Sequence, residues 1–322
     1  MTTFKEIRGT DILALSSDPS NPELGQIWYN SSSGTLKGYK AVNTWSAGGT
    51  MNTVRAYLGS ATNATQSTGL AFAGTANGGV TSLSATELYN GTTWTTSSGS
   101  MGTARYQLGG AGTQTAGLGF GGYSVPVGIT GATEKYNGTA WTATGSLNTV
   151  RRGVKGFGVQ TAALAFGGGG PSAATESFNG STWTSVNSMN TARGTLGSAG
   201  ILTAGLAFGG IITAVTAATE SWNGTSWTSV NSMNTARFGL AGAGTQTSAL
   251  GFGGKTPTIT GATELWNGTS WTSNPTSLTT ARSYLGGCGT QTSALGFGGI
   301  TPTVTGATEA WTGTATQTVT VS

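Results

Sequence analysis

Apolar and polar positions recur in one repeated order from about Trp45 to the C-terminus. The cleanest copies read N-T-A-R, a Gly- and Ala-rich stretch, T-Q-T, small apolar residues and F-G-G. A variable insert follows, then A-T-E, an aromatic residue, N-G and W-T. In the copy Arg237–Trp271, short apolar runs alternate with turn residues, which predicts four strands. The runs are 238–244, 248–252, 262–266 and 269–273. Asn267-Gly268 predicts a two-residue hairpin turn between the last two.

The repeat occurs six times, and its closing tryptophans are 47, 42, 44 and 44 residues apart. These tryptophans are Trp94, Trp141, Trp183, Trp227 and Trp271. A period in this range, with several short strands per unit, indicates propeller blades rather than a helical solenoid. We therefore predict an all-β propeller of six four-stranded blades, in residues 49–322. Residues 1–48 are predicted to form an N-terminal arm and a β-hairpin that serves as an anchoring segment.

The number of blades depends on how the ring closes. Six blades result if the segment 315–322 (ATQTVTVS) forms the fourth strand of the last repeat, and its T-V-T-V alternation suits a strand. Seven blades result if Ile27–Asn30, Leu36–Lys40 and Asn43–Ala47 form most of an extra blade. Closure through Trp45 is a further alternative, since its surroundings resemble a fourth strand. We favour six blades closed by the C-terminal segment.

One Arg and one Glu recur in every copy, and these residues carry nearly all the charge of the repeats. Matched signs at each copy predict structural ion pairs, within or between blades. The alternative is a ring of carboxylates for cations, or of arginines for anions. The paired residues are Arg55 and Glu87, Arg105 and Glu134, Arg151 and Glu176, Arg193 and Glu220, Arg237 and Glu264, and Arg282 and Glu309.

Composition excludes several classes of function. There is no His and one Cys, Cys288, so imidazole chemistry, Cys/His metal sites and internal disulfides are excluded. Cys288 replaces a small residue of other copies and is expected to lie in the core. Between residue 50 and the C-terminus, the charged residues outside the repeat pattern are all basic, which leaves no candidate general base. These residues are Lys135, Arg152, Lys155 and Lys255. We predict no enzymatic activity, no cofactor and no metal.

Charge and hydropathy also limit the partners. Charged residues make up 7% of the chain, the net charge is +4, and basic residues do not cluster, so nucleic acid is not an expected partner. The first twenty residues contain no uninterrupted apolar stretch, which predicts neither a signal peptide nor a membrane span.

The repeats resemble the kelch repeat. The shared elements are the Arg before the first strand, the Gly-Gly after the second, the aromatic residue on the third and the Trp on the fourth. The resemblance covers about residues 45–322 and implies a kelch-like propeller. Among kelch-like proteins, the copper centre of the galactose oxidase family requires histidine, so that activity does not carry over to this chain.

The N-terminal stretch G-Q-I-W-Y-N-S-S-S-G-T-L-K-G-Y, residues 25–39, is similar to a hairpin module of bacteriophage tail and fibre proteins. Its place before G-T-Q-T-A-G-L-x-F-G-G repeats resembles kelch-like structural proteins of marine phages. The resemblance implies a virion structural protein, made in the host cytoplasm and carried on a tail fibre, tail or capsid. We expect Trp28, Tyr29 and Tyr39 to anchor it to other virion proteins, and a homo-oligomer is compatible with this role.

The inserts between the second and third strands vary most among the copies, and such loops usually hold the binding specificity of a propeller. Their candidate contact residues are Tyr123, Val125, Ile211, Ile212, Lys255 and Ile300. Their partner would be a host-surface glycan or protein. The alternative function is a soluble carbohydrate-binding lectin of the propeller type.

Overall fold

The structure is a computed structural model that describes residues 12–19 and 26–320, without the side chains of 39–42 and 314–319. All of its regular elements are strands. The chain divides into two compact units. One is formed by the residues up to Thr44 together with those from Thr312, and the other is Trp45–Trp311. The boundary therefore falls before the predicted residue 48, and the C-terminal segment groups with the N-terminal one.

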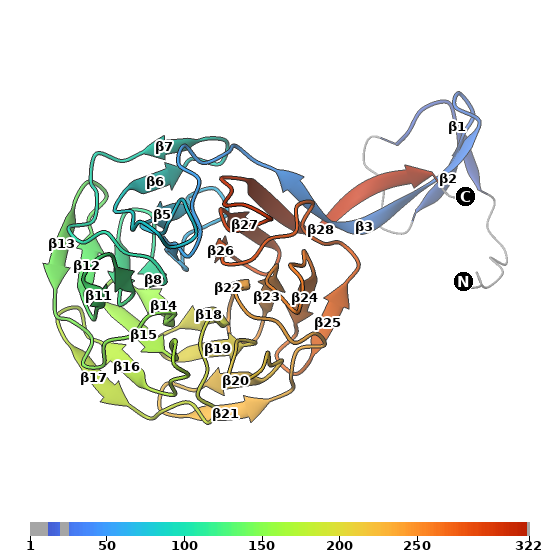
Figure 1. The fold of residues 1–322 in the computed structure, drawn as a ribbon. Helices are drawn as coiled ribbons and strands as arrows, with labels where there is room; N and C mark the ends of the chain where they lie inside the picture. The colour runs from blue at the N-terminus through green and yellow to red at the C-terminus, as the bar shows by residue number, and fades with distance from the viewer. Residues whose placement is uncertain (1–11, 20–25, 321–322) are drawn as a thin grey trace. The chain divides into compact units, whose positions relative to one another are not determined.

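The unit Trp45–Trp311 is a six-bladed propeller whose sheets lie radially around one centre (Figure 1). Blades 1 to 5 are separate antiparallel sheets. Blade 1 consists of β4 (Gly59–Ser60), β5 (Leu70–Phe72), β6 (Thr86–Tyr89) and β7 (Trp94–Thr96). Blade 2 consists of β8 (Gly109–Gly112), β9 (Gly117–Phe120), β12 (Thr133–Tyr136) and β13 (Trp141–Thr144), with the insert hairpin β10 (Tyr123–Ser124) and β11 (Gly128–Ile129).

The next three blades repeat the same order. Blade 3 consists of β14 (Lys155–Val159), β15 (Ala162–Phe166), β16 (Thr175–Phe178) and β17 (Trp183–Val186). Blade 4 consists of β18 (Gly197–Ile201), β19 (Ala204–Phe208), β20 (Thr219–Trp222) and β21 (Trp227–Val230). Blade 5 consists of β22 (Ala241–Gly244), β23 (Ala249–Phe252), β24 (Thr263–Trp266) and β25 (Trp271–Asn274).

Blade 6 joins the two ends of the propeller. Its strands are β26 (Gly286–Gly289), β27 (Ser293–Phe297), the start of β28 (Thr308–Thr320) and the end of β3 (Thr35–Ala47), in that order. The prediction that 315–322 forms the fourth strand is therefore wrong, because residues 315–320 continue the third strand. Residues 321 and 322 lie outside the described residues. The alternative of closure through Trp45 is confirmed, and an edge strand supplied from the N-terminal side closes the ring.

Side-chain hydrogen bonds join neighbouring blades, one kind in all six blades and a second kind in five. The Nε1 of the outer-strand Trp donates to the Thr of the A-T-E segment in the preceding blade, at 2.8–3.1 Å. Trp45 takes part as the sixth tryptophan and donates to Thr263 at 3.0 Å. In five blades the Gln of the first turn also donates to carbonyls of the preceding blade. Blade 4 has Leu202 at that position.

The core lies between neighbouring sheets. The third-strand aromatics are all buried, as are the F-G-G phenylalanines. Cys288 is also buried, as expected, and burial raises the pKa of its thiol to about 12. The third-strand aromatics are Tyr89, Tyr136, Phe178, Trp222, Trp266 and Trp311. Packing rather than sugar stacking therefore accounts for this position.

The N-terminal unit contains β1 (Leu13–Leu15), β2 (Ile27–Asn30) and the first part of β3. β1 pairs with β2 in parallel, and β2 forms an antiparallel hairpin with β3. Asp18 accepts hydrogen bonds from Trp28 (3.1 Å) and Asn30 (2.7 Å) and pairs with Lys37 (2.8 Å). Hydrogen bonds from Lys37 and Asn30 lower the pKa of Asp18 to about 2. These strands form no seventh blade.

Replacement of Trp45 by alanine tests this closure. Trp45 packs on Phe252 and Trp311, with ring centroids 4.9 and 5.3 Å away. W45A is expected to lower the free energy of unfolding by about 3–5 kcal/mol, as for a buried aromatic residue. The measurement is denaturant unfolding of the full chain, with W183A as the matched control at the same position of blade 3. An unchanged free energy of unfolding in W45A, beside a lowered one in W183A, would contradict closure by this strand.

Candidate functional site

The repeat Arg and Glu form six ion pairs, each within one blade, at N···O distances of 2.5–3.1 Å. In blade 5, Arg237 donates to Glu264 at 2.9 Å, and its other terminal nitrogen donates to the carbonyls of Gly253 and Ala262. Glu264 also accepts the backbone N–H groups of Asn234 and Thr235. The pair therefore fastens the connection between blades onto the third strand.

These pairs are nearly inaccessible to solvent, with side-chain exposures of at most 5%. Burial lowers the pKa of the guanidinium groups, and the partner glutamate opposes this effect; for Arg105 the pKa is about 10. The six glutamates are the only acidic residues of the propeller sequence, so each of its carboxylates is held by a repeat arginine. The predicted pairing is confirmed.

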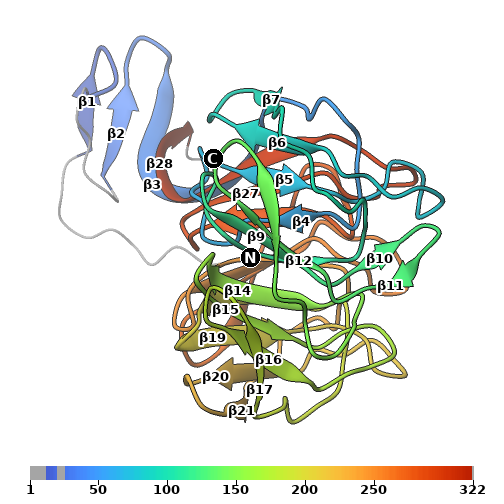
Figure 2. The ribbon, with the colours of Figure 1, turned by 90° about the vertical axis from the view of Figure 1, so that its left-hand side faces the viewer.

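The insert loops lie on one face of the propeller, where the β10–β11 hairpin projects (Figure 2). Backbone bridges join the residue after each repeat Arg to the start of an insert in five blades, for example Tyr106 to Tyr123 and Phe238 to Lys255. The residue that follows each bridge residue turns the chain toward the propeller axis. The inserts therefore surround the ends of the inner strands at the axis. We refer to this side as the insert face.

The predicted contact residues are distributed around the insert face. Tyr123 packs on Tyr106 at 5.4 Å, and the Arg152 guanidinium lies 5.6 Å from the Tyr123 ring centroid. Val125 is 40% exposed and Ile212 is 36% exposed. Ile211, Lys255 and Ile300 each take part in a backbone bridge of their own insert. The structure does not bring the six together in one pocket.

One hollow on this face lies between the inserts of blades 1 and 6. It has a volume of about 440 Å³ and includes Ile300. Its other lining residues are Ala76, Asn77, Gly78, Pro302, Thr303 and Val304. The hollow is open, uncharged and large enough for a sugar ring.

A closed ring of backbone hydrogen bonds surrounds the axis. The residue two positions after each repeat Arg donates its N–H to the equivalent carbonyl of the preceding blade, at 2.6–3.2 Å. All six have a left-handed backbone, with φ between 52° and 63°. They are Tyr57, Gln107, Gly153, Thr195, Gly239 and Tyr284. Glycine accepts this conformation freely, whereas the four other residues hold it at a cost of about 1 kcal/mol or more each.

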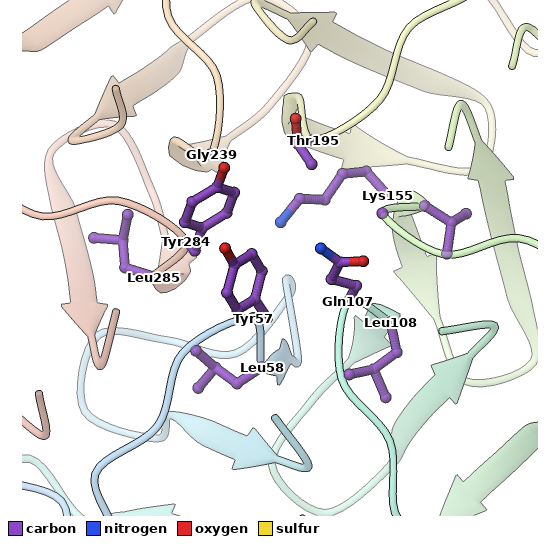
Figure 3. Close-up of a pocket in the computed structure, with 11 residues that line it drawn as sticks. Tyr57, Leu58, Gln107, Leu108, Lys155, Thr195, Gly239, Tyr284 and Leu285 are labelled. Carbon is purple, nitrogen blue, oxygen red and sulfur yellow. The ribbon is translucent and has the colours of Figure 1, made fainter. Parts of the chain in front are cut away.

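Side chains of this ring and Lys155 line an axial cavity of about 30 Å³. Tyr57 and Tyr284 stack with ring centroids 4.1 Å apart, and their hydroxyls share a hydrogen bond. Figure 3 shows the Lys155 ammonium and the Gln107 amide directed into the space beside this tyrosine pair. Leu58, Leu108 and Leu285 form the apolar wall.

Lys155 is a cation without a counterion. Within 12–19 and 26–320, no carboxylate pairs with it, since the six propeller glutamates are bound to the repeat arginines. Burial lowers the pKa of Lys155 to about 8. Burial also raises the pKa values of Tyr57 and Tyr284, so both phenols are neutral at physiological pH. The cavity thus combines one titratable cation with neutral hydrogen-bond donors.

The sequence identified Lys155 as an exception to the repeat but not as part of a site. Other copies have Gly or Ala at its position, and that difference was the available signal. Its neighbours come from other blades, so their proximity depends on the radial arrangement.

Of the anchoring residues, Trp28 is fully buried and Tyr29 is 41% exposed. Trp28 therefore stabilises the N-terminal unit, and Tyr29 is available for contact. The side chain of Tyr39 lies outside the described residues.

No family model and no curated protein matches this sequence. Among solved structures, the fold is similar to the "Structure of YjhT", with a TM-score of 0.70 and 14% sequence identity. The match covers 84% of this chain and 99% of that chain. At this identity the likeness shows the fold, a kelch-type β-propeller.

Within residues 12–19 and 26–320, no helix is of a length and hydropathy suited to crossing a membrane. The same part of the chain contains no group of three or more His, Cys, Asp or Glu side chains placed to hold a metal ion.

Replacement of Glu220 by alanine separates a structural pair from an ion-binding ring. E220A leaves the buried Arg193 charge unpaired and is expected to lower the free energy of unfolding by about 3–5 kcal/mol. Thermal and denaturant unfolding give the measurement. The double variant R193M/E220M is the control and is expected to recover part of this loss. Unchanged stability in E220A would contradict the structural role.

Replacement of Lys155 by methionine tests the desolvated ammonium. Below pH 8 the ammonium of Lys155 is charged in both the folded and the unfolded protein, and its desolvation in the folded state lowers the free energy of unfolding. This penalty disappears as the pH rises from about 8 toward 10.5, the ordinary pKa of lysine. K155M is therefore expected to raise the free energy of unfolding at pH 6 by about 1–3 kcal/mol. This gain is expected to shrink between pH 8 and pH 10.5. Unfolding is measured across pH in buffers without carboxylates.

The matched control is K135M, because Lys135 lies on β12 and donates to the Gly180 carbonyl away from the axis. K135M is unfolded in the same buffers, as a lysine replacement outside the axial cavity. A K155M protein that is less stable than wild type at pH 6 would contradict the assignment of Lys155 as a desolvated cation.

Proposed function

We propose that this chain is a non-enzymatic structural protein of a bacteriophage particle, which displays its propeller on a tail fibre, tail or capsid. The proposal rests above all on the N-terminal hairpin, whose sequence resembles tail and fibre modules. This hairpin belongs to a compact unit distinct from the propeller. Trp28, Asn30 and Lys37 of its hairpin all bind Asp18, so the segment has a polar centre of its own.

The chemistry of the propeller is consistent with a structural task. Its six carboxylates are engaged in buried ion pairs, and its thiol is buried with a raised pKa. Catalytic sites in repeat folds use residues that depart from the repeat, and no carboxylate of the propeller departs from it. A body of this kind suits assembly into a particle and attachment to a host surface.

A soluble lectin of the propeller type is the second candidate. The observation that favours it is the hollow of about 440 Å³ between the inserts of blades 1 and 6. The buried third-strand aromatics do not serve such a role, so the insert residues would make the contacts. The two functions are compatible in a host-attachment fibre.

Deletion of residues 1–44 tests the anchoring role. The deletion ends before Trp45, so the closing strand of blade 6 is kept. We expect at least a tenfold loss of the protein from purified particles, measured by quantitative mass spectrometry. Full incorporation of the deleted protein would contradict anchoring by this segment.

A variant with insert 300–306 shortened to a Gly-Gly turn is the matched control. It is expected to enter particles at the level of the full chain, since the change lies in the propeller. The same variant also tests the second candidate, the lectin function, on a glycan array. Glycan binding by the isolated full chain that is lost in the shortened variant would support the lectin function.

A further inference from the structure

The inner strand of blade 3 departs from the repeat at one position beside the axis. Blades 1, 2, 4 and 6 have Gly59, Gly109, Gly197 and Gly286 where blade 3 has Lys155. At these glycines an added Cβ would lie 2.2–2.5 Å from the ring of the F-G-G phenylalanine on the next strand. A side chain is therefore excluded at this position in those blades.

Blade 3 is repacked to accept the lysine. Lys155 is paired in register with Phe166, and the Phe166 ring packs against Phe157 at 5.0 Å. Phe157 itself replaces an Ala or Cys of the other blades, and Gly205 leaves room for it in blade 4, where a Cβ would lie 2.0 Å from its ring. Blade 3 therefore differs from the other blades at two positions of its inner strand, Lys155 and Phe157, and a glycine of blade 4 leaves room for the second.

The groups around the Lys155 ammonium are neutral and can both donate and accept hydrogen bonds. Gln107 contributes an amide, Tyr57 and Tyr284 contribute two hydroxyls, and the hydroxyl of Thr195 is bound to the Gly194 carbonyl. Lys155 and the two phenols are the titratable groups lining the cavity. One hydroxyl proton of the tyrosine pair is used between the two rings, and the other is free to donate. A cation among neutral groups that are able to donate, with no anion among the described residues, is complementary to an anionic oxygen.

The size of the cavity limits the ligand. A volume of about 30 Å³ holds one or two small groups, and a second space of about 20 Å³ lies beyond Lys155 toward Ser60 and Ser198. A single lysine balances one negative charge, which favours a monoanion over a phosphate. The apolar wall of Leu58, Leu108 and Leu285 suits the carbon end of a short acid.

We propose that the axial cavity is a binding site for a small carboxylate, held by Lys155 and oriented by Gln107 and the Tyr57–Tyr284 pair. The site is independent of the virion proposal, since it depends on the propeller alone. Three of the four propeller cations without a carboxylate partner, Arg152, Lys155 and Lys255, lie on the insert face or at the axis. They give this face a positive field that attracts anions.

Binding and protonation of Lys155 are coupled. A bound carboxylate stabilises the ammonium form, so saturating ligand is expected to raise the pKa of Lys155 above its unliganded value of about 8. By the same linkage the carboxylate affinity is expected to fall about tenfold for each pH unit above that pKa.

Formate and acetate are the probes, each titrated into the full chain at constant ionic strength. The Lys155 Cε resonance, assigned by its absence in K155M, is followed by NMR, and millimolar dissociation constants are expected at pH 6.5. Acetamide, which has nearly the same shape as acetate without the charge, is expected not to shift the resonance. K135M is the matched control and is expected to bind acetate like wild type.

Three results would overturn the proposal. These are no response of Lys155 to either acid, an equal response to chloride at the same concentration, or acetate binding that persists in K155M. Loss of acetate binding in K155M with a retained thermal transition supports the site and excludes unfolding as the cause. A stronger response to acetate than to formate would show that the apolar wall contributes.

Discussion

The buried repeat arginine is the interaction on which the propeller depends. Its guanidinium binds the blade's own glutamate and two carbonyls, while its backbone carbonyl accepts the N–H of a glycine in the preceding blade. In blade 5, for example, Arg237 holds Glu264 by its side chain and Gly210 by its carbonyl. Each arginine therefore connects one blade to the next.

This arrangement explains why so few charges suffice in a chain of 322 residues. A buried pair contributes little net stability over an apolar substitute, but loss of one partner is costly, so the pair fixes geometry. Two residues beyond each arginine the chain enters the axial ring of backbone hydrogen bonds. The outer tryptophans provide a second ring at the periphery, and Trp45 completes it.

Much of the fold could be predicted from the sequence, because a repeated pattern places equivalent residues in equivalent positions. The six blades and the Arg–Glu pairing follow from the period and from the matched charges. The closing strand was predicted wrongly, since the T-V-T-V alternation of 315–322 indicates a strand but does not specify its neighbour. Trp45 carried the better signal, because it supplied the tryptophan that the last repeat lacks.

The axial cavity could be predicted only in part. Lys155 was visible as an exception to the repeat, but its neighbours Tyr57, Gln107 and Tyr284 are separated from it by 98, 48 and 129 positions in the sequence. Their meeting depends on blade number and inner-strand register, which local patterns do not specify. The insert residues lie between the second and third strands of their blades, Tyr123 on the short strand β10, yet the conformation of each insert decides whether they converge, and here they remain apart.

Native-state hydrogen exchange of the axial amides tests the central claim, a closed ring held by the repeat arginines, most directly. The account predicts that the six N–H groups of the axial ring, including those of blades 1 and 6, exchange only through global unfolding and with one common free energy. Faster exchange of the Tyr57 N–H, which bonds to the Tyr284 carbonyl where the first and last blades meet, would show an open ring and contradict the account.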